Sequence, residues 1–368
     1  MPNRRQLAAQ RVDASLPRAQ ALRERLGGDA LVLTRPGSVN WLGGGISDPI
    51  DVTASSDPVW VVLTSERRVL ISTTIEVPRL VRDFDVEALG FETLGVAWYR
   101  AGAMAEAVRD VLGPGARVLA DVPELGQDVS EHIVLTRMAL SEVERDELRR
   151  LGRDTSDALE QALASWEPGL SRDLDLAGEI AGALASHGAV PVCLIVGGDE
   201  RLRQLRHPLS VGDVLNEAVM AVVVARRGGL HVAATRLAVT RASDPIVALT
   251  QRLASVDEAV RAASRPGRTW GQAVEALAEA YRAIGHEGAW SEHYQGGPIA
   301  FEQREFELAP GQHESSFWAK PCEEGCAVAW NPSLTGGAKI EETYLIGEFG
   351  LEPVTRVENE YERVKVVG

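Results

Sequence analysis

Two histidines stand where the neighbouring residues suit proton-transfer chemistry. His207 directly precedes Pro208, and His293 is followed by Gly296, Gly297 and Pro298. A neutral imidazole exchanges protons near neutral pH, and glycines let the backbone approach a ligand closely. The two segments therefore predict either acid–base groups in a cleft or, as the alternative, two structural histidines, one before a proline and one under a glycine loop.

The three cysteines predict neither a disulfide scaffold nor a zinc site. They are Cys193, Cys322 and Cys326, an odd and small number. Cys322 and Cys326 are four residues apart with no second Cys/His pair nearby, whereas a structural zinc ion needs about four ligands. We interpret them as ordinary thiols of a cytoplasmic protein, since the cytoplasm keeps thiols reduced.

The composition excludes several classes of partner. The chain has 368 residues, of which 45% are hydrophobic and 25% charged, and its formal net charge is −15. Such an acidic surface repels nucleic acid and anionic lipid. No apolar run approaches the roughly 20 residues that span a bilayer, and residues 1–10 lack the apolar core of a secretory signal. The length suits two domains, and we expect neither nucleic acid nor membrane as a partner.

The N-terminal part reads as a small α/β domain. Glycine pairs and alternating apolar residues mark its elements, and the segment Asn40-Trp41-Leu42 is expected at the end of a strand, packed in the core. The expected elements are a helix over residues 5–26, a strand over 30–33, a hairpin of 59–63 with 69–71, a helix ending near 112, and a strand over 118–120.

The remainder of the chain repeats one order of elements twice. A long helix that opens with the capping pair Ser141 and Glu144 reaches residue 166, and a second long helix covers residues 244–263. Each is followed by a Pro-Gly turn and a shorter helix, with Ser171 expected to cap the first and Thr269 the second. A β-hairpin closes each copy, over residues 219–239 and 326–346. Two such hairpins can form one curved sheet, with the helices outside and a cleft inside.

This layout resembles the duplicated pita-bread fold of the creatinase, Xaa-Pro peptidase and methionine aminopeptidase superfamily. The resemblance covers about residues 138–355 and rests on five motifs in the family's order. The motifs are His207-Pro208, LHVAATR at 230–236 (family Y-x-x-D-x-T-R), SEHYQGGPIAFEQRE at 291–305 (family G-H-G-x-G and, downstream, a G-R-E or similar element), AWNPSL at 329–334 (family T-x-E-P-G) and KIEET at 339–343 (family R-x-E-D). The resemblance implies an α/β (α+β) chain with a smaller creatinase-like N-terminal α/β domain, residues 1–137, and a pita-bread domain, residues 138–368.

The sequence departs from the family at the metal ligands. The peptidases hold two metal ions with two Asp, one His and two Glu. Ala233 and Asn331 stand where an Asp and a Glu are expected, and residues 218–225 contain no carboxylate. Only His293 and Glu341 match, and two ligands cannot hold a pair of divalent ions. The chain therefore resembles the branch with degraded metal ligands, to which creatinase belongs, and we expect no cofactor.

The resemblance also implies roles for individual residues. His207, His293 and Glu341 are the expected catalytic groups, with His207 as the proton carrier. A second set of polar residues is expected to bind substrate: Arg304, Arg236, Gln295, Asn331, Glu305 and Lys339. Arg304 suits a substrate carboxylate, and Glu341 suits a guanidinium, amine or amide of the substrate. Alternatively, these charges form a structural ion pair, or Lys339 neutralises Glu341 where metals would otherwise lie.

Three functions follow from these observations. The first is a metal-independent hydrolase of a C–N bond in a small zwitterionic amidine- or amide-type substrate, in a homodimer as the family implies. The second is an Xaa-Pro dipeptidase or aminopeptidase with two Mn, Co or Zn ions. The third is a non-catalytic pita-bread binding protein.

Overall fold

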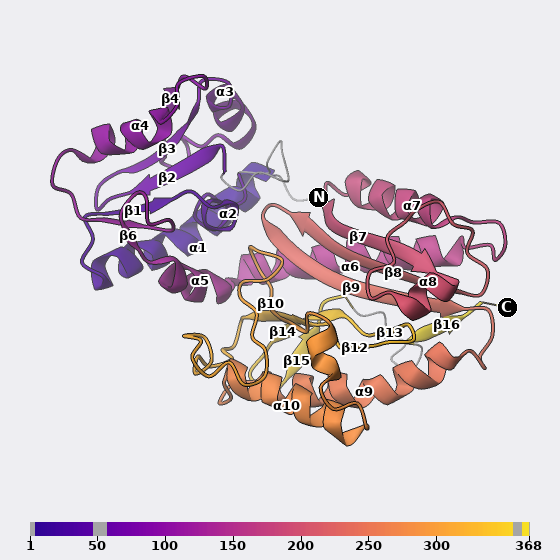
Figure 1. Cartoon of the computed structure of the whole chain (residues 1–368). Helices are drawn as coiled ribbons and strands as arrows, with labels where there is room; N and C mark the ends of the chain where they lie inside the picture. Colours follow the sequence, from indigo (N-terminus) through magenta and orange to yellow (C-terminus); the bar gives the residue numbers. More distant parts are fainter. Residues whose placement is uncertain (1–3, 47–56, 356–362, 368) are drawn as a thin grey trace. The chain divides into compact units, whose positions relative to one another are not determined.

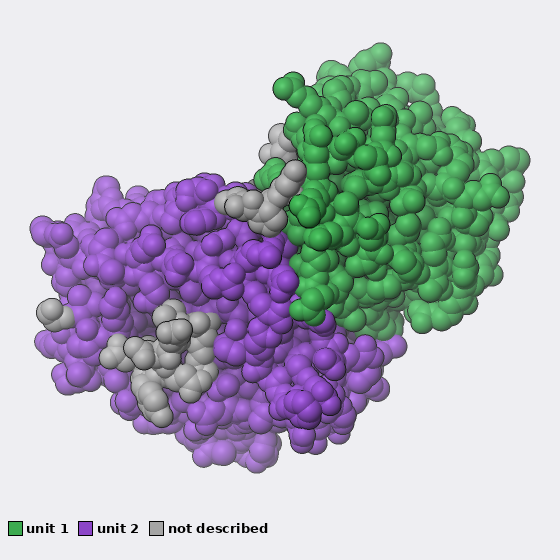
Figure 2. Space-filling view, turned by 180° about the vertical axis from the view of Figure 1, so that it is seen from behind, with its two compact units in different colours: residues 1–144, 228–230 green, residues 145–227, 231–368 purple. Residues whose placement is uncertain are grey.

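The computed structural model describes residues 4–46, 57–355 and 363–367, and it divides into two compact units (Figure 1, Figure 2). Unit 1 comprises residues 1–144 and 228–230, and unit 2 comprises residues 145–227 and 231–368. The boundary expected between residues 137 and 138 falls at the end of helix α5 (Ser130–Met138), and the units divide slightly later, within helix α6 (Glu142–Ala164). None of the helices in the described ranges has the length and apolar character needed to cross a membrane.

Unit 1 is built on one six-stranded sheet. Its strand order is β4-β3-β2-β1-β5-β6, with β1 antiparallel to β2 and parallel to β5. The predicted hairpin is confirmed, since β2 and β3 pair antiparallel from Val59↔Ser72 to Leu63↔Arg68. The elements are α1 (Arg4–Arg25), β1 (Ala30–Leu33), α2 (Pro36–Leu42), β2 (Val59–Leu63), β3 (Arg68–Thr73), α3 (Val77–Arg79), a π-helical turn (Leu80–Phe84), β4 (Glu92–Val96), α4 (Ala103–Leu112), β5 (Val118–Ala120), β6 (Gln127–Asp128) and α5.

The segment Asn40-Trp41-Leu42 lies in a helix, so the prediction of a strand end there was wrong. Arg35 is extended, and Pro36 follows it at the first helical position, where its missing N–H costs nothing. The side chain of Trp41 is fully buried, as core packing requires.

Unit 2 contains two four-stranded sheets and a small hairpin. The sheet orders are β16-β9-β8-β7 and β10-β11-β14-β15, and β12 pairs with β13. Helix α7 packs against β7, and α9 packs against α10 beside the second sheet (Figure 1). The elements are α6, α7 (Asp173–Ser186), β7 (Val190–Gly198), α8 (Asp199–Gln204), β8 (Ala218–Arg227), β9 (Leu230–Val239), α9 (Pro245–Ala263), α10 (Trp270–Ala283), a 3-10 turn (Ala289–Glu292), β10 (Gly296–Pro298), β11 (Ala327–Trp330), β12 (Ser333–Leu334), β13 (Ala338–Lys339), β14 (Glu342–Ile346), β15 (Leu351–Pro353) and β16 (Val364–Val366).

The two predicted hairpins of this unit are confirmed. Strands β8 and β9 are neighbours, and β11 pairs with β14 antiparallel, with Trp330 opposite Glu342. The chain between β11 and β14 forms the additional β12–β13 hairpin, in which Ser333 lies opposite Lys339. That small hairpin fixes the position of Lys339 within the unit.

Hydrogen bonds join the two halves of unit 2 into one surface. The Thr235 N–H donates to the Glu341 carbonyl at 2.9 Å. The Thr343 hydroxyl accepts from the Ala233 N–H at 2.8 Å and donates to the Ala233 carbonyl at 2.9 Å. Strand β9 therefore lies beside the segment that leads into β14, which places residues of the two repeats side by side.

Helix capping follows the sequence at two of three predicted positions. Thr269 and Gln272 form the expected capping box, and Ser141 and Glu144 bond to each other at the start of α6. The assignment of Ser171 as a cap was wrong, because Arg172 occupies the N-cap position of α7. The Ser171 hydroxyl instead accepts from the N–H of Glu167 at 2.9 Å and closes the preceding turn.

Candidate functional site

The structure brings His207 and His293 into direct contact. His207 follows α8 in the first repeat, and His293 follows the 3-10 turn of the second repeat in an extended conformation. Their Nε2 atoms are 3.0 Å apart, and the ring centroids are 4.9 Å apart. The His207 side chain is exposed and that of His293 half-buried. The pair is therefore open to a ligand on the side of His207.

The hydrogen bonds of the pair define its tautomers. The Nδ1 of His293 bonds to the Tyr294 carbonyl, and because a carbonyl oxygen only accepts, Nδ1 carries the hydrogen. In the neutral ring Nε2 is then an acceptor, so the Nε2–H of His207 donates to it. This assignment leaves the lone pair on Nδ1 of His207, which has no partner among the described residues.

The surroundings keep both rings neutral. Burial, followed by the charge of Lys339, lowers the pKa of His293 to about 4. Burial and then Lys339 also lower the pKa of His207. Both imidazoles are therefore neutral at pH 7, and the free lone pair on Nδ1 of His207 is available as a proton acceptor.

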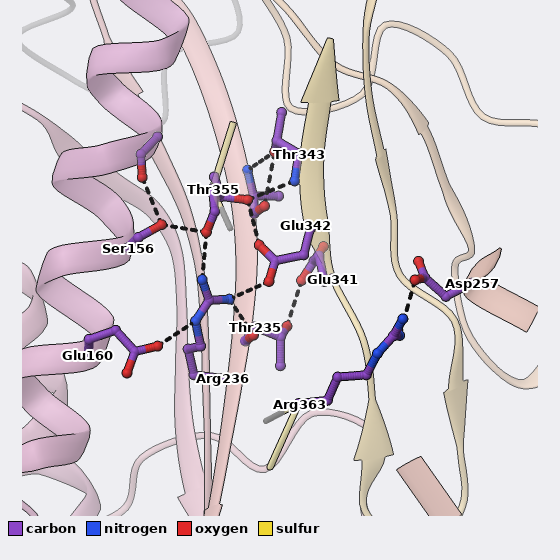
Figure 3. A network of polar contacts seen from close by, with 12 residues as sticks. Ser156, Glu160, Thr235, Arg236, Asp257, Glu341, Glu342, Thr343, Thr355 and Arg363 are labelled. Carbon is purple, nitrogen blue, oxygen red and sulfur yellow. Dashed lines mark hydrogen bonds and ion pairs between the residues drawn. The ribbon is translucent and has the colours of Figure 1, made fainter. Parts of the chain in front are cut away.

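Beside the pair, the carboxylate of Glu341 is buried and shared by three donors. The Thr235 hydroxyl donates to Oε2 at 2.8 Å (Figure 3). The Lys339 Nζ lies 3.4 Å from Oε2, and Nη2 of Arg304 lies 3.4 Å from Oε1. Burial raises the pKa of Glu341, but Lys339 and then Arg304 outweigh that effect and hold the pKa below its ordinary value. Glu341 is therefore an anion that binds two cations of its own chain.

Asn331 is the member of the predicted substrate-binding set whose side chain is buried and unsatisfied. It is 4% exposed, and its Oδ1 has no hydrogen-bond partner in the described part of the chain. A buried amide oxygen without a partner costs about 1–3 kcal/mol. The Asn331 amide is therefore suited to bond to a ligand or to water.

Gln295 holds the backbone of His293 in place. Its Nε2 donates to the carbonyls of Trp290 and His293 at 2.9 and 2.8 Å. Its Oε1 accepts from the Tyr281 hydroxyl at 3.1 Å, and that hydroxyl accepts from the Ser333 N–H at 2.9 Å. Both ends of the amide are therefore used, which makes Gln295 a positioning residue. Sequence reasoning missed Tyr281, which no motif marks.

Arg236 and Glu305 are engaged in structural contacts. The guanidinium of Arg236 bonds to Glu160 at 2.9 Å and to Glu342 at 2.7 Å (Figure 3). The carboxylate of Glu305 accepts from the N–H of Phe301 at 2.8 Å within its own loop. Their expected role in substrate binding finds no support in these contacts.

Cys193 and Thr235 belong to the same region although neither was predicted as a site residue. The charges of Glu341, Lys339 and Arg304 act on the Cys193 thiol, whose pKa is raised by burial first and then by Glu341. The thiol therefore stays protonated. Thr235 belongs to the motif of residues 230–236, so its position beside Glu341 could have been inferred from that strand.

The residues at the expected metal positions do not fit a pair of metal ions. Strand β8 is apolar and buried over residues 218–225, and Ala233 is fully buried. Lys339 and Arg304 contact the carboxylate that would be a ligand. Across the described ranges, no three or more His, Cys, Asp or Glu side chains are grouped to hold a metal ion.

Comparisons with known proteins identify the fold. No protein-family model and no curated protein matches the sequence. Among solved structures, the prolidase from Pyrococcus horikoshii OT3 is 16% identical, with 94% of this chain and 99% of that chain covered and a TM-score of 0.73. The dipeptidase PepE from Mycobacterium ulcerans is 21% identical, with 98% and 99% covered and a TM-score of 0.76.

A third similar structure is named as part of a complex and not as a peptidase. It is the N-terminal domain of the FACT complex subunit SPT16 from Cicer arietinum, 14% identical, with 97% and 99% covered and a TM-score of 0.68. Identities this low establish architecture. The chain therefore has the pita-bread fold of these solved structures, which is the fold that its motifs predict.

Proposed function

We propose that this protein is a metal-independent hydrolase that cleaves a C–N bond of a small substrate. The observation behind the proposal is the contact between two neutral histidines, His207 and His293, beside a buried cationic cluster. A positioned general base with a pKa below neutral is in the active, unprotonated form at pH 7. The fold adds support, because similar structures carry the names prolidase and dipeptidase.

The chemistry assigned to the pair is proton transfer to and from water. Nδ1 of His207 accepts a proton as water attacks the carbonyl or amidine carbon and a C–O bond forms. The same proton then passes to the nitrogen as the C–N bond breaks, which leaves an acid and an amine from an amide, or an amide and an amine from an amidine. His293, fixed by its bond to the Tyr294 carbonyl, orients the His207 ring through the Nε2 contact.

The contacts of Glu341 favour an amide over an amidine. Anchoring an amidinium needs a free carboxylate, but Glu341 is shared by Lys339 and Arg304. Its proposed role is to hold these two cations at the cleft.

The Xaa-Pro dipeptidase with two metal ions is the weaker candidate. The names of the similar structures favour it, but it requires five ligands, and cations contact Glu341 where a metal would bind. A non-catalytic binding protein is a further candidate, favoured by the similar structure that is named as a subunit of a complex. The contact and neutrality of the two histidines favour catalysis over binding alone.

The test is hydrolysis of a panel of N-acyl amino acids, amino-acid amides and amidines with EDTA present. The proteins are wild type, His207→Ala and, as a matched control, His132→Ala on the exposed face of α5. We expect turnover that EDTA does not reduce, a loss of at least about 100-fold in kcat for His207→Ala, and no change for His132→Ala. Turnover that occurs only without EDTA and with added Mn, Co or Zn would contradict the metal-independent mechanism and favour the metal-dependent candidate.

A further inference from the structure

The cluster around Glu341 holds one cation more than its own carboxylate can neutralise. In the part of the chain that the structure describes, Lys339 and Arg304 each contact a single carboxylate, and it is the same one. Their side chains are only 5% and 20% exposed. The neighbouring histidines are neutral and contribute no charge. A buried cation without a counter-charge is unfavourable, so the cluster favours an added anion.

A hollow lies directly against Lys339. It is bounded by α8 with the residues after it and by the β12–β13 hairpin, and it encloses about 280 Å³, open solvent included. Leu202, Met220 and Leu334 supply apolar lining, and Lys339 and Arg206 supply charge. Because Lys339 lines the hollow together with these apolar residues, a carboxylate bound at Lys339 would place an attached apolar group against them.

Other cations of the hollow already have counter-charges. Arg203 bonds to Asp244 at 2.7 Å, and Arg206 bonds to Glu292 and to the Ser333 hydroxyl. Lys339, by contrast, shares its carboxylate with Arg304. Of these cations, Lys339 is the one whose position combines surplus charge with the apolar lining.

The charge balance also defines the rest of the ligand. An ammonium or amidinium group needs a carboxylate, and Glu341 already binds two cations. An acyl group on the nitrogen removes that requirement. In an N-acyl amino acid, the carboxylate, the side chain and the amide nitrogen are bonded to the same α-carbon. The carboxylate can therefore reach Lys339 while the side chain reaches the hollow and the amide reaches His207.

We propose that Lys339 binds the carboxylate of the substrate and that the hollow receives the apolar side chain beside it. The substrate class is then N-acylated apolar amino acids, which carry one negative charge. This inference rests on the proposed function for its scissile amide, but the anion site itself can be tested without any reaction.

The probe is 4-methylpentanoate, which has a carboxylate and a leucine-like chain but no C–N bond. Its neutral counterpart is 4-methylpentan-1-ol, and acetate tests the apolar chain. Dissociation constants are measured by calorimetry for wild type, Lys339→Met, Lys339→Arg and Lys365→Met. Lysine occurs at three positions in the chain, 320, 339 and 365, and Lys365 in β16 serves as the matched control.

We expect wild type to bind 4-methylpentanoate at least about tenfold more tightly than the alcohol, which lacks the charge-assisted hydrogen bond, and than acetate, which lacks the apolar chain. Lys339→Met should abolish the preference over the alcohol, while Lys339→Arg and Lys365→Met retain it. A folded Lys339→Met protein that keeps the preference, or wild type without saturable binding of the anion, would overturn the inference. Anion binding without hydrolysis of N-acetyl-leucine would support the site and contradict the proposed function.

Discussion

The charge count around Glu341 predicts an asymmetry between two substitutions. Glu341→Gln removes the anion and leaves the buried Lys339 and Arg304 facing each other without a counter-charge. Breaking a buried ion pair in this way costs about 3–5 kcal/mol of unfolding free energy. Lys339→Met removes the surplus cation, leaves the pair of Arg304 and Glu341 with the Thr235 hydrogen bond, and keeps an apolar stem of similar length. Its cost should be no more than about 1 kcal/mol.

Urea unfolding followed by circular dichroism measures both values. The double variant Lys339→Met/Glu341→Gln should be more stable than Glu341→Gln alone, because one of the two uncompensated cations is gone. Lys365→Met controls for the general effect of removing a lysine. Equal losses for Lys339→Met and Glu341→Gln would show that Lys339 is a required partner of Glu341 rather than a surplus cation, which would contradict the proposed anion site.

Three further predictions concern the surroundings of the pair. Between pH 7 and pH 5 the unfolded chain protonates His293 near its ordinary pKa while the folded protein, with a pKa of about 4, does not. The free energy of unfolding should therefore fall by about 1–2 kcal/mol between pH 7 and pH 5. An equal fall in the His293→Gln protein would show that His293 is not its cause. Arg236→Met should lower the free energy of unfolding in urea by about 2–4 kcal/mol, because Glu342 and Glu160 lose the cation that they share. Binding of 4-methylpentanoate should not change. Altered binding would indicate that Arg236 contacts the ligand. Gln295→Ala should lower kcat about tenfold with little change in KM, because the His293 backbone loses the hydrogen bond that positions it. A change in KM alone would indicate that Gln295 contacts the substrate.

The elements that depend on local sequence could be predicted. The local structure at the Pro-Gly turns, at the Thr269 cap and along the alternating apolar segments depends on only a few neighbouring residues. The corresponding helices and hairpins therefore lie where the sequence predicts them. Two local details differ. Pro36 starts a helix where a strand end was expected, and Arg172 rather than Ser171 caps α7.

The roles of polar residues depend on partners far along the chain and could not be predicted as well. Arg236 meets Glu160 and Glu342, which lie 76 and 106 residues away in sequence. Gln295 is engaged by Tyr281 from α10, which no motif connects to the site. The family motifs place residues on strands, but the pairing of charges depends on which side chains the fold then brings together.

The central claim, chemistry without metal, is tested most directly by elemental mass spectrometry on purified protein that has not been dialysed. We expect Mn, Co and Zn well below one ion per chain, in protein that retains hydrolytic activity. About two ions per chain, lost together with activity on chelation, would contradict the assignment of Lys339 and Arg304 to the place of the metals.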